Sequence, residues 1–373
     1  MMGGFMLSMA MERSGAHRRI ALTMVHAFGG RGGGRQLVFG FMVASAFLSM
    51  WISNAATSLM LLPIVAATME RSDNAHLKQC LYLGVAYAAS VGGIGTPIGT
   101  PPNLVFMKFY VEVAGGQEPT FATWMMWALP IMLVMLPVVG LWLTRGLKAE
   151  GNLGLPKIGG WRYEEMATLA VFALTALLWI TRKEPFGGWS GLLGIPDASD
   201  ANVALLAVVV MHLLPNGKGE TLLTWEDAKK IPWGILILYG GGIAIAKAFG
   251  QSGLDELIAS SLTGLANVPV LLMIALVCFS VTFLTEVTSN TATANLILPI
   301  LAATAAAAAI DPRLVMVPAT ISASFAFMLP VATPPNAIVF GSGELTIEQM
   351  AREGFALNLI GIVIVTTICY LMF

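Results

Sequence analysis

Long apolar runs follow one another through this chain, and they constrain its fold more than any other feature. Val268–Leu284 and Ala356–Phe373 are two of them, and each approaches the ~20 residues that a helix needs to cross a bilayer. The chain is 57% hydrophobic and only 11% charged, whereas soluble domains are about 25% charged. We therefore expect an all-α polytopic protein that is integral to a membrane, crosses it several times and resides in the bacterial inner (plasma) membrane.

The charge, the cysteine positions and the motifs of the chain disfavour several function classes. The net charge of −1 gives no reason to expect a nucleic-acid partner. Cys80, Cys278 and Cys369 lie in or beside apolar segments, so no disulfide framework is implied. The sequence shows no nucleophile–base pair, metal-ligand cluster or nucleotide motif, so we predict that it is not an enzyme, has no catalytic residues and uses no organic cofactor.

Two short polar motifs each occur twice inside the apolar runs. Ser53-Asn54 returns as Ser289-Asn290, 236 residues later, and both pairs are followed by Ala, Thr, Leu, Pro and Ile at matching positions. Thr100–Asn103 and Thr333–Asn336 both read Thr-Pro-Pro-Asn, at an offset of 233 residues. Paired motifs in the same order indicate an internal repeat. Hydrophobic segments interrupted by Gly or Pro at matching positions are typical of inverted-repeat secondary transporters.

The repeat predicts how the chain is organised. Each copy should contain a re-entrant hairpin and then a broken helix. The hairpins are expected at about 36–69 and 266–310, and the broken helices at about 81–110 and 314–341. Full spans are expected at 121–143, 163–180, 201–214 and 231–248. The predicted units are 1–35 (start of the first repeat and an amphipathic cytoplasmic segment), 36–144 (first transport unit), 145–162 (cytoplasmic linker), 163–264 (scaffold helices) and 265–373 (second transport unit).

The two copies are unequal at their beginnings. Ahead of Gly241, the second copy has three apolar stretches, at 163–180, 201–214 and 231–240. The first copy has no room for their equivalents, because Gly3-Gly4, which corresponds to Gly241-Gly242, lies next to Met1. We expect that the first repeat lacks its N-terminal helices. Most Lys and Arg residues fall on one side of the predicted spans, which places 18–35 in the cytoplasm.

The Thr-Pro-Pro motifs predict unwound backbone within the membrane. Proline has no N–H and disfavours α geometry in the preceding residue, so a helix should stop near Thr100 and near Thr333. The freed carbonyls of about Gly99 and Ala332, with nearby Ser and Asn side chains, would form an oxygen-only pocket of the kind that a hard cation such as Na⁺ prefers. The helices that start after the breaks favour an anion. Together these features predict cation-coupled anion uptake.

The doubled motifs and the run Gly92–Asn103 resemble the divalent-anion:sodium symporter family of di- and tricarboxylate and sulfate carriers. The resemblance implies a homodimeric elevator-type transporter in membrane lipid, with Na⁺ as the coupling ion and a small dianion as the substrate. One implied sodium site comprises Ser49, Ser53, Asn54 and Gly99, and the other comprises Thr285, Ser289, Asn290 and Ala332. The implied substrate-binding residues are Ser53, Asn54, Ala55, Thr100, Pro101, Ser289, Asn290, Thr291, Thr333 and Pro334.

The function expected from this resemblance is sodium-coupled transport of a C4-dicarboxylate such as succinate. The alternatives are an anion exchanger or sulfate carrier on the same fold, or a truncated fragment that does not transport. Ala55 departs from the Thr usual in the family, which removes one hydroxyl donor worth on the order of 1 kcal/mol. The sequence leaves open whether Asn103, Asn336 and Glu286 contact ligand or stabilise the backbone.

Overall fold

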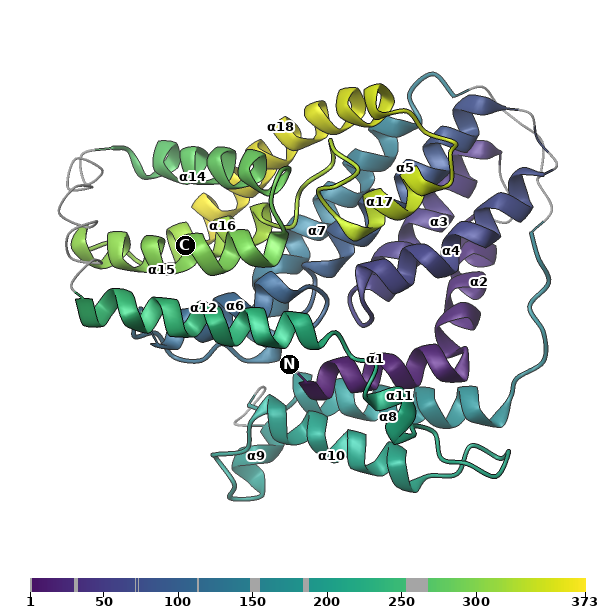
Figure 1. The fold of residues 1–373 in the computed structure, drawn as a ribbon, viewed down its shortest axis with the longest axis horizontal. Helices are drawn as coiled ribbons and strands as arrows, with labels where there is room; N and C mark the ends of the chain where they lie inside the picture. The colour runs from purple at the N-terminus through teal and green to yellow at the C-terminus, as the bar shows by residue number, and fades with distance from the viewer. Residues whose placement is uncertain are drawn as a thin grey trace.

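The computed structural model describes residues 2–29, 33–70, 72, 74–112, 114–147, 155–183, 188–252 and 268–373. Across these ranges the chain is helical and contains no strand, so the all-α prediction is confirmed. The helices, shown in Figure 1, are α1 (Met2–Ser14), α2 (Ala16–Gly29), α3 (Gly34–Ser49), α4 (Asn54–Met69), α5 (Ala75–Gly93), α6 (Pro101–Glu112), α7 (Phe121–Leu143), α8 (Tyr163–Ile180), α9 (Gly188–Leu192), α10 (Asp200–Leu213), α11 (Trp225–Ala228), α12 (Trp233–Ser252), α14 (Val270–Thr285), α15 (Asn290–Ala307), α16 (Arg313–Ser322), α17 (Pro334–Gly341) and α18 (Ile347–Met372).

Helix length distinguishes α3, α4 and α14 from the spanning helices, although α15 and α8 both have 18 residues. Within the described ranges, α7, α8 and α18 are long and apolar enough to cross a bilayer. In contrast, α3, α4 and α14 have 16 residues each. At ~1.5 Å per residue they measure about 24 Å, which is less than the ~30 Å hydrocarbon thickness. These helices are as apolar as the spanning ones, so they fit the predicted re-entrant hairpins.

The two hairpins are α3–α4, with its turn at 50–53, and α14–α15, with its turn at 286–289. They approach from opposite ends of the molecule, and their turns face each other in its middle (Figure 1). This arrangement agrees with the inverted repeat expected from the doubled motifs. Residues 266 and 267, where the second hairpin was predicted to begin, lie outside the described residues, as do 253–264 of the predicted scaffold unit.

The helix breaks begin earlier than predicted. The expectation that helix would stop near Thr100 and near Thr333 is wrong, because α5 ends at Gly93 and α16 ends at Ser322. The Pro-Pro pairs instead open the following helices, α6 and α17. Proline suits the first turn of a helix because the N–H that it lacks has no helical partner there. The unwound segments are therefore 94–100 and 323–333.

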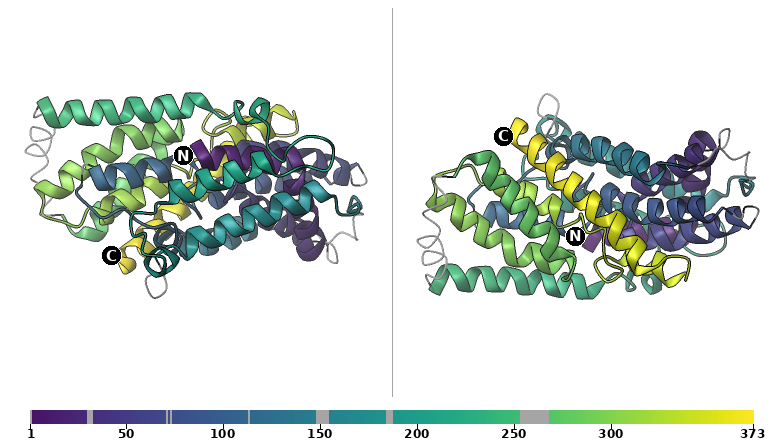
Figure 2. Two further views of the ribbon diagram at one scale, coloured as in Figure 1. Left: turned by 90° about the horizontal axis from the view of Figure 1, so that it is seen from below. Right: turned by 90° about the horizontal axis from the view of Figure 1, so that it is seen from above.

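The two repeats pack into each other. Helix α6 contacts α15 and α16, α17 contacts α4 and α5, and α7 contacts α18. In the right-hand view of Figure 2, α18 lies diagonally between the second hairpin and the helices of the first repeat. Helices α8 and α10 pack on each other and on α1. At the centre is α5, which is buried on every side from Cys80 to Gly93, as expected for a helix surrounded by others.

The close packing of α5 on α3 depends on Gly92. A Cβ atom at this position would lie 2.2 Å from the carbonyl oxygen of Ala46. We predict that Gly92→Ala lowers stability by about 1–3 kcal/mol, the usual cost of overpacking. Thermal unfolding of the detergent-solubilised protein, followed by tryptophan fluorescence, measures the effect. Gly191→Ala is the control, since a Cβ there meets nothing within 4 Å. Equal melting temperatures for the two variants would contradict the prediction.

Candidate functional site

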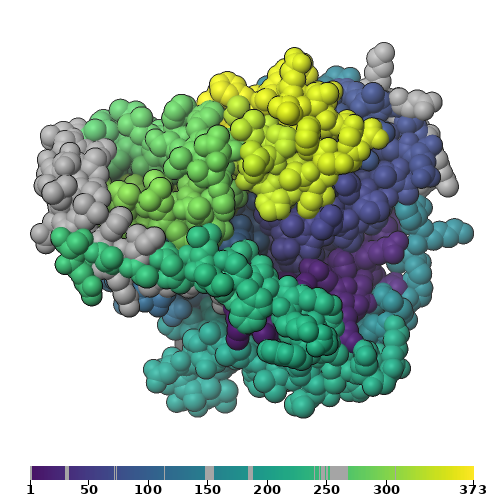
Figure 3. All heavy atoms as spheres, viewed as in Figure 1, coloured from purple at the N-terminus to yellow at the C-terminus, as the bar shows by residue number. Residues whose placement is uncertain are grey.

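A cavity of about 1610 Å³ lies between the two hairpin turns. It opens as the hollow between α12 and α4 at the centre of Figure 3. The residues that the sequence predicted to bind substrate all line it, although they come from four separate segments. They are Ser53, Asn54, Ala55, Thr100, Pro101, Ser289, Asn290, Thr291, Thr333 and Pro334.

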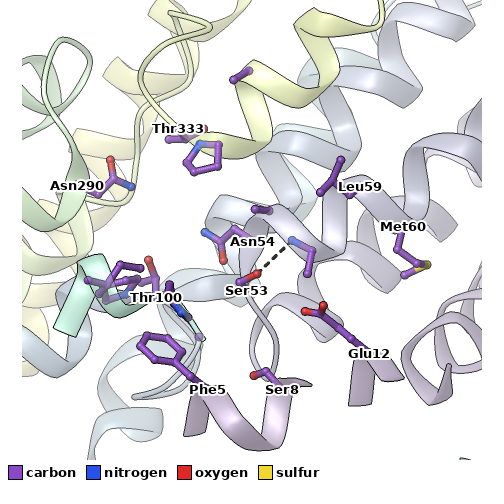
Figure 4. A pocket seen from close by; sticks show the side chains of 18 of the residues that line it. Phe5, Ser8, Glu12, Ser53, Asn54, Leu59, Met60, Thr100, Asn290 and Thr333 are labelled. Carbon is purple, nitrogen blue, oxygen red and sulfur yellow. Dashed lines mark hydrogen bonds between the residues drawn. The ribbon is translucent and has the colours of Figure 1, made fainter. Parts of the chain in front are cut away.

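The first hairpin turn is fixed by two side-chain hydrogen bonds. The Ser49 hydroxyl donates to Oδ1 of Asn54 at 2.6 Å, and Ser49 is fully buried behind the cavity. The Ser53 hydroxyl accepts from the backbone N–H of Ala56 at 3.1 Å and so caps α4 (Figure 4). Asn54 therefore lies at the cavity wall with its side-chain oxygen held from behind.

The second turn repeats the same bond. The Thr285 hydroxyl lies 2.8 Å from Oδ1 of Asn290 and 3.0 Å from the carbonyl oxygen of Ala323. Thr285 is fully buried, as Ser49 is, and Asn290 lines the cavity. Each turn thus has a hydroxyl bonded to the asparagine five residues later, and Figure 4 shows Asn54 and Asn290 beside the same space.

Two further asparagines hold the helix breaks. Nδ2 of Asn103 donates to the carbonyl oxygens of Gly93 at 3.0 Å and Thr96 at 2.7 Å. Nδ2 of Asn336 donates to those of Ala326 and Leu329, at 3.1 and 3.0 Å. In both repeats the accepting residues stand ten and seven positions before the asparagine. Neither asparagine lines the cavity. They stabilise the backbone, which is one of the two possibilities that the sequence left open.

Glu286 also stabilises backbone, although only in the second repeat. Its buried carboxylate accepts from the N–H groups of Met328 at 2.9 Å and Leu329 at 3.0 Å. Nδ2 of Asn358 on α18 donates to the same carboxylate at 2.7 Å. Sequence reasoning overlooked Asn358, whose position as a polar residue inside an apolar helix was the available signal. In the first repeat the matching residue is Met50, whose carbonyl oxygen accepts from the hydroxyl of Thr96.

Oxygen atoms gather behind the first turn. A Cβ atom at Gly99 would lie 2.5 Å from the carbonyl oxygen of Gly93 and 2.9 Å from that of Ser49. A Cβ atom at Gly93 would lie 2.7 Å from Oδ1 of Asn54. Carbonyl, hydroxyl and amide oxygens suit a hard cation, so this donor set fits Na⁺. Behind the second turn, the donor set comprises Thr285, Asn290 and the unwound backbone at Ala332, which lines the cavity.

The centre of the cavity favours negative charge without any basic side chain. Helices α4, α15, α6 and α17 all begin at residues that line it. Each helix N-terminus carries roughly half a positive charge on its free N–H groups, and these groups bind anions. None of the residues predicted to bind substrate is charged. An anion held here would therefore be bound by helix ends, hydroxyls and amides.

The outer part of the cavity contains residues that sequence reasoning missed. Ser8 lies on the α1 side, and its hydroxyl is 2.9 Å from the carbonyl oxygen of Trp51 in the first hairpin turn. The charged and titratable groups of the cavity are also here, contributed by α1, α2 and the segment after α11. They are Glu12, His17, Arg18 and Lys230. No motif marks these residues, since they are gathered by tertiary packing.

A family model and known proteins match nearly the whole chain. Residues 1–372 match the family described as "Sodium:sulfate symporter transmembrane region". The chain is 38% identical to a sodium-dependent dicarboxylate transporter, SdcS, of Staphylococcus saprophyticus, over 100% of this chain and 75% of the relative. It is also 38% identical to SdcS of Staphylococcus aureus strain NCTC 8325, over 99% of this chain and 75% of that protein.

The fold is similar to that of a solved transporter. The crystal structure of YdaH from Alcanivorax borkumensis superposes with a TM-score of 0.69 at 15% identity, covering 98% of this chain and 83% of that one. Such low identity supports the shared fold alone. The family match and the two relatives support more: the chain belongs to the sodium:sulfate symporter family and is a multi-pass integral membrane transporter rather than an enzyme.

Proposed function

We propose that this protein carries a C4-dicarboxylate such as succinate together with Na⁺, by an elevator mechanism. The supporting observation is that hairpin turns and helix breaks from both repeats line one cavity, with oxygen donors behind the turns. Two relatives of 38% identity are described as sodium-dependent dicarboxylate transporters. The bacterial origin of these relatives supports the inner membrane as the location.

The proposal gives each group of residues a distinct role. Ser49, Ser53, Asn54 and Gly99 hold one Na⁺, and Thr285, Ser289, Asn290 and Ala332 hold the other. Bound Na⁺ supplies positive charge close to the substrate carboxylates. The first carboxylate is bound at Ser53–Ala55 and the second at Ser289–Thr291. Thr100, Pro101, Thr333 and Pro334 close the pocket between them.

The elevator step requires that the two transport units move as one body against the scaffold. The contacts of α6 with α15 and of α17 with α4 and α5 support this, because they join residues 36–144 to residues 265–373. The scaffold helices α8 and α10 expose apolar side chains, among them Leu174, Leu206 and Leu213. We assign this surface to lipid and to the partner copy of a homodimer.

Replacing either turn asparagine tests the proposed symport. We predict that Asn54→Ala and Asn290→Ala each reduce sodium-driven succinate uptake into proteoliposomes at least about tenfold, since each change removes a cation ligand and an anion donor together. Asn202→Ala is the control, because Asn202 only caps an exposed helix end. Uptake that persists without sodium would contradict symport and favour exchange. Stronger competition by sulfate than by fumarate would indicate a sulfate carrier.

Ala55 offers a test of the substrate position. It occupies the second residue of α4, as Thr291 does in α15. We predict that Ala55→Thr tightens succinate binding in sodium about fivefold, since one added hydrogen bond contributes about 1 kcal/mol. Ala55→Val has nearly the same shape without the hydroxyl and is the matched control. Isothermal titration measures both. Equal affinities for the Thr and Val variants would show that this position does not contact the anion.

A further inference from the structure

Glu12 is an unusual side chain to find in the wall of an anion-binding cavity. It lies in the last turn of α1, is half-buried, and lines the cavity on the α1 side (Figure 4). Ser8 stands one helical turn earlier, so the two residues share a face of α1. The bond from Ser8 to the Trp51 carbonyl shows that this face is directed at the first hairpin turn.

Within the described part of the chain, the side chain of Glu12 forms no hydrogen bond or ion pair. The adjacent Arg13 is directed elsewhere, since it pairs with Glu220 and Asp227. Lys230, the cavity lysine, also pairs with Asp227, at 2.8 Å. The carboxyl group of Glu12 is thus partly removed from water without a counter-charge, and this burial raises its pKa to about 7.

The neighbouring charged groups leave this conclusion unchanged. Burial lowers the pKa of His17, and Arg18 lowers it further, so the imidazole is mainly neutral at pH 7. Arg18 is exposed at the cavity surface. The other charged groups and histidines on the helices packed against α1 have partners of their own: Arg19 with Glu165, Glu164 with Lys218, Asp200 with Arg182, Glu226 with Lys229, His26 with the carbonyl of Pro156, and His212 with that of Val208.

We propose that Glu12 couples anion binding to proton uptake: the bound dianion increases the fraction of Glu12 carboxyl groups that are protonated, and the protons come from solution. This inference rests on the proposed function. The physical reason is Coulombic, because a carboxylate and a dianion in one cavity repel each other. Protonation removes the repulsion. By linkage, a group whose protonation strengthens anion binding must itself bind its proton more tightly when the anion is present.

The sign of the pH dependence follows from the raised pKa. Below about pH 7 Glu12 is mostly neutral and the dianion binds without repulsion. Above it the carboxylate is charged and the dianion binds more weakly, by about fivefold for a charge at the rim of the cavity. Fumarate is the appropriate probe, because both its carboxyl groups ionise well below neutral pH and it stays a dianion over this range.

The experiment is isothermal titration of the purified protein with fumarate, in sodium, near pH ~7. HEPES and Tris differ in ionisation enthalpy, so the difference in heat between them counts the protons taken up. We expect net proton uptake in the wild type and an affinity that falls about threefold from about pH 6 to about pH 8, which is part of the full range of about fivefold. Glu12→Gln should abolish the buffer dependence and flatten the pH profile, whereas Glu12→Asp should retain both.

Glu226→Gln is the matched control, because Glu226 is exposed and does not line the cavity; it should behave as the wild type. Identical heats in the two buffers for the wild type, or proton uptake that survives in Glu12→Gln, would overturn the inference while leaving the proposed function standing. Failure of both the wild type and Glu12→Gln to bind fumarate at any pH would overturn the proposed function, and this inference with it.

Discussion

A helix that ends inside a membrane must find partners for its free carbonyl and N–H groups, because hydrocarbon offers none. The rest of this structure depends on how that requirement is met. Asn103 and Asn336 bind the carbonyls of the unwound segments from within, at the same two spacings in each repeat. Glu286 binds two N–H groups of the second break. Because these buried side chains bind the backbone of the breaks, the N–H groups at the helix starts and the hairpin turns can face the cavity.

This arrangement, in which helix starts and hairpin turns face the cavity, explains the proposed coupling between cation and anion. The centre of the cavity has helix N-termini and hydroxyls but no basic residue among the ten predicted substrate ligands. Fractional charges at helix ends attract an anion only moderately, so a dianion gains from cations bound close by. In the proposal, Asn54 and Asn290 lie between the cation and anion sites, and each accepts a hydrogen bond from a buried hydroxyl group. On this proposal, neither ligand binds well alone.

The sequence predicted the fold well because its strongest signals were local or repeated. The doubled Ser-Asn and Thr-Pro-Pro-Asn motifs located both hairpins and the ends of both breaks, and apolar length predicted the bounds of α7 and α8. Prediction from the sequence failed where a side chain contacts a part of the chain that is remote in the sequence. Asn103 binds the carbonyl oxygen of Gly93, the last residue of α5, which lies ten residues earlier in the chain. Glu286 accepts hydrogen bonds from α18 and from the backbone of a break some forty residues later. Glu12 reaches the cavity only through packing of α1, which no periodicity reveals.

The central claim is that one cavity holds a dianion between two sodium sites, and binding linkage tests it most directly. The measurement is the dissociation constant of succinate for the purified protein over a range of sodium concentrations, with potassium keeping the ionic strength constant. The account predicts that affinity rises with sodium, with a logarithmic slope that approaches two at low sodium. Succinate that binds equally well in potassium alone would contradict it.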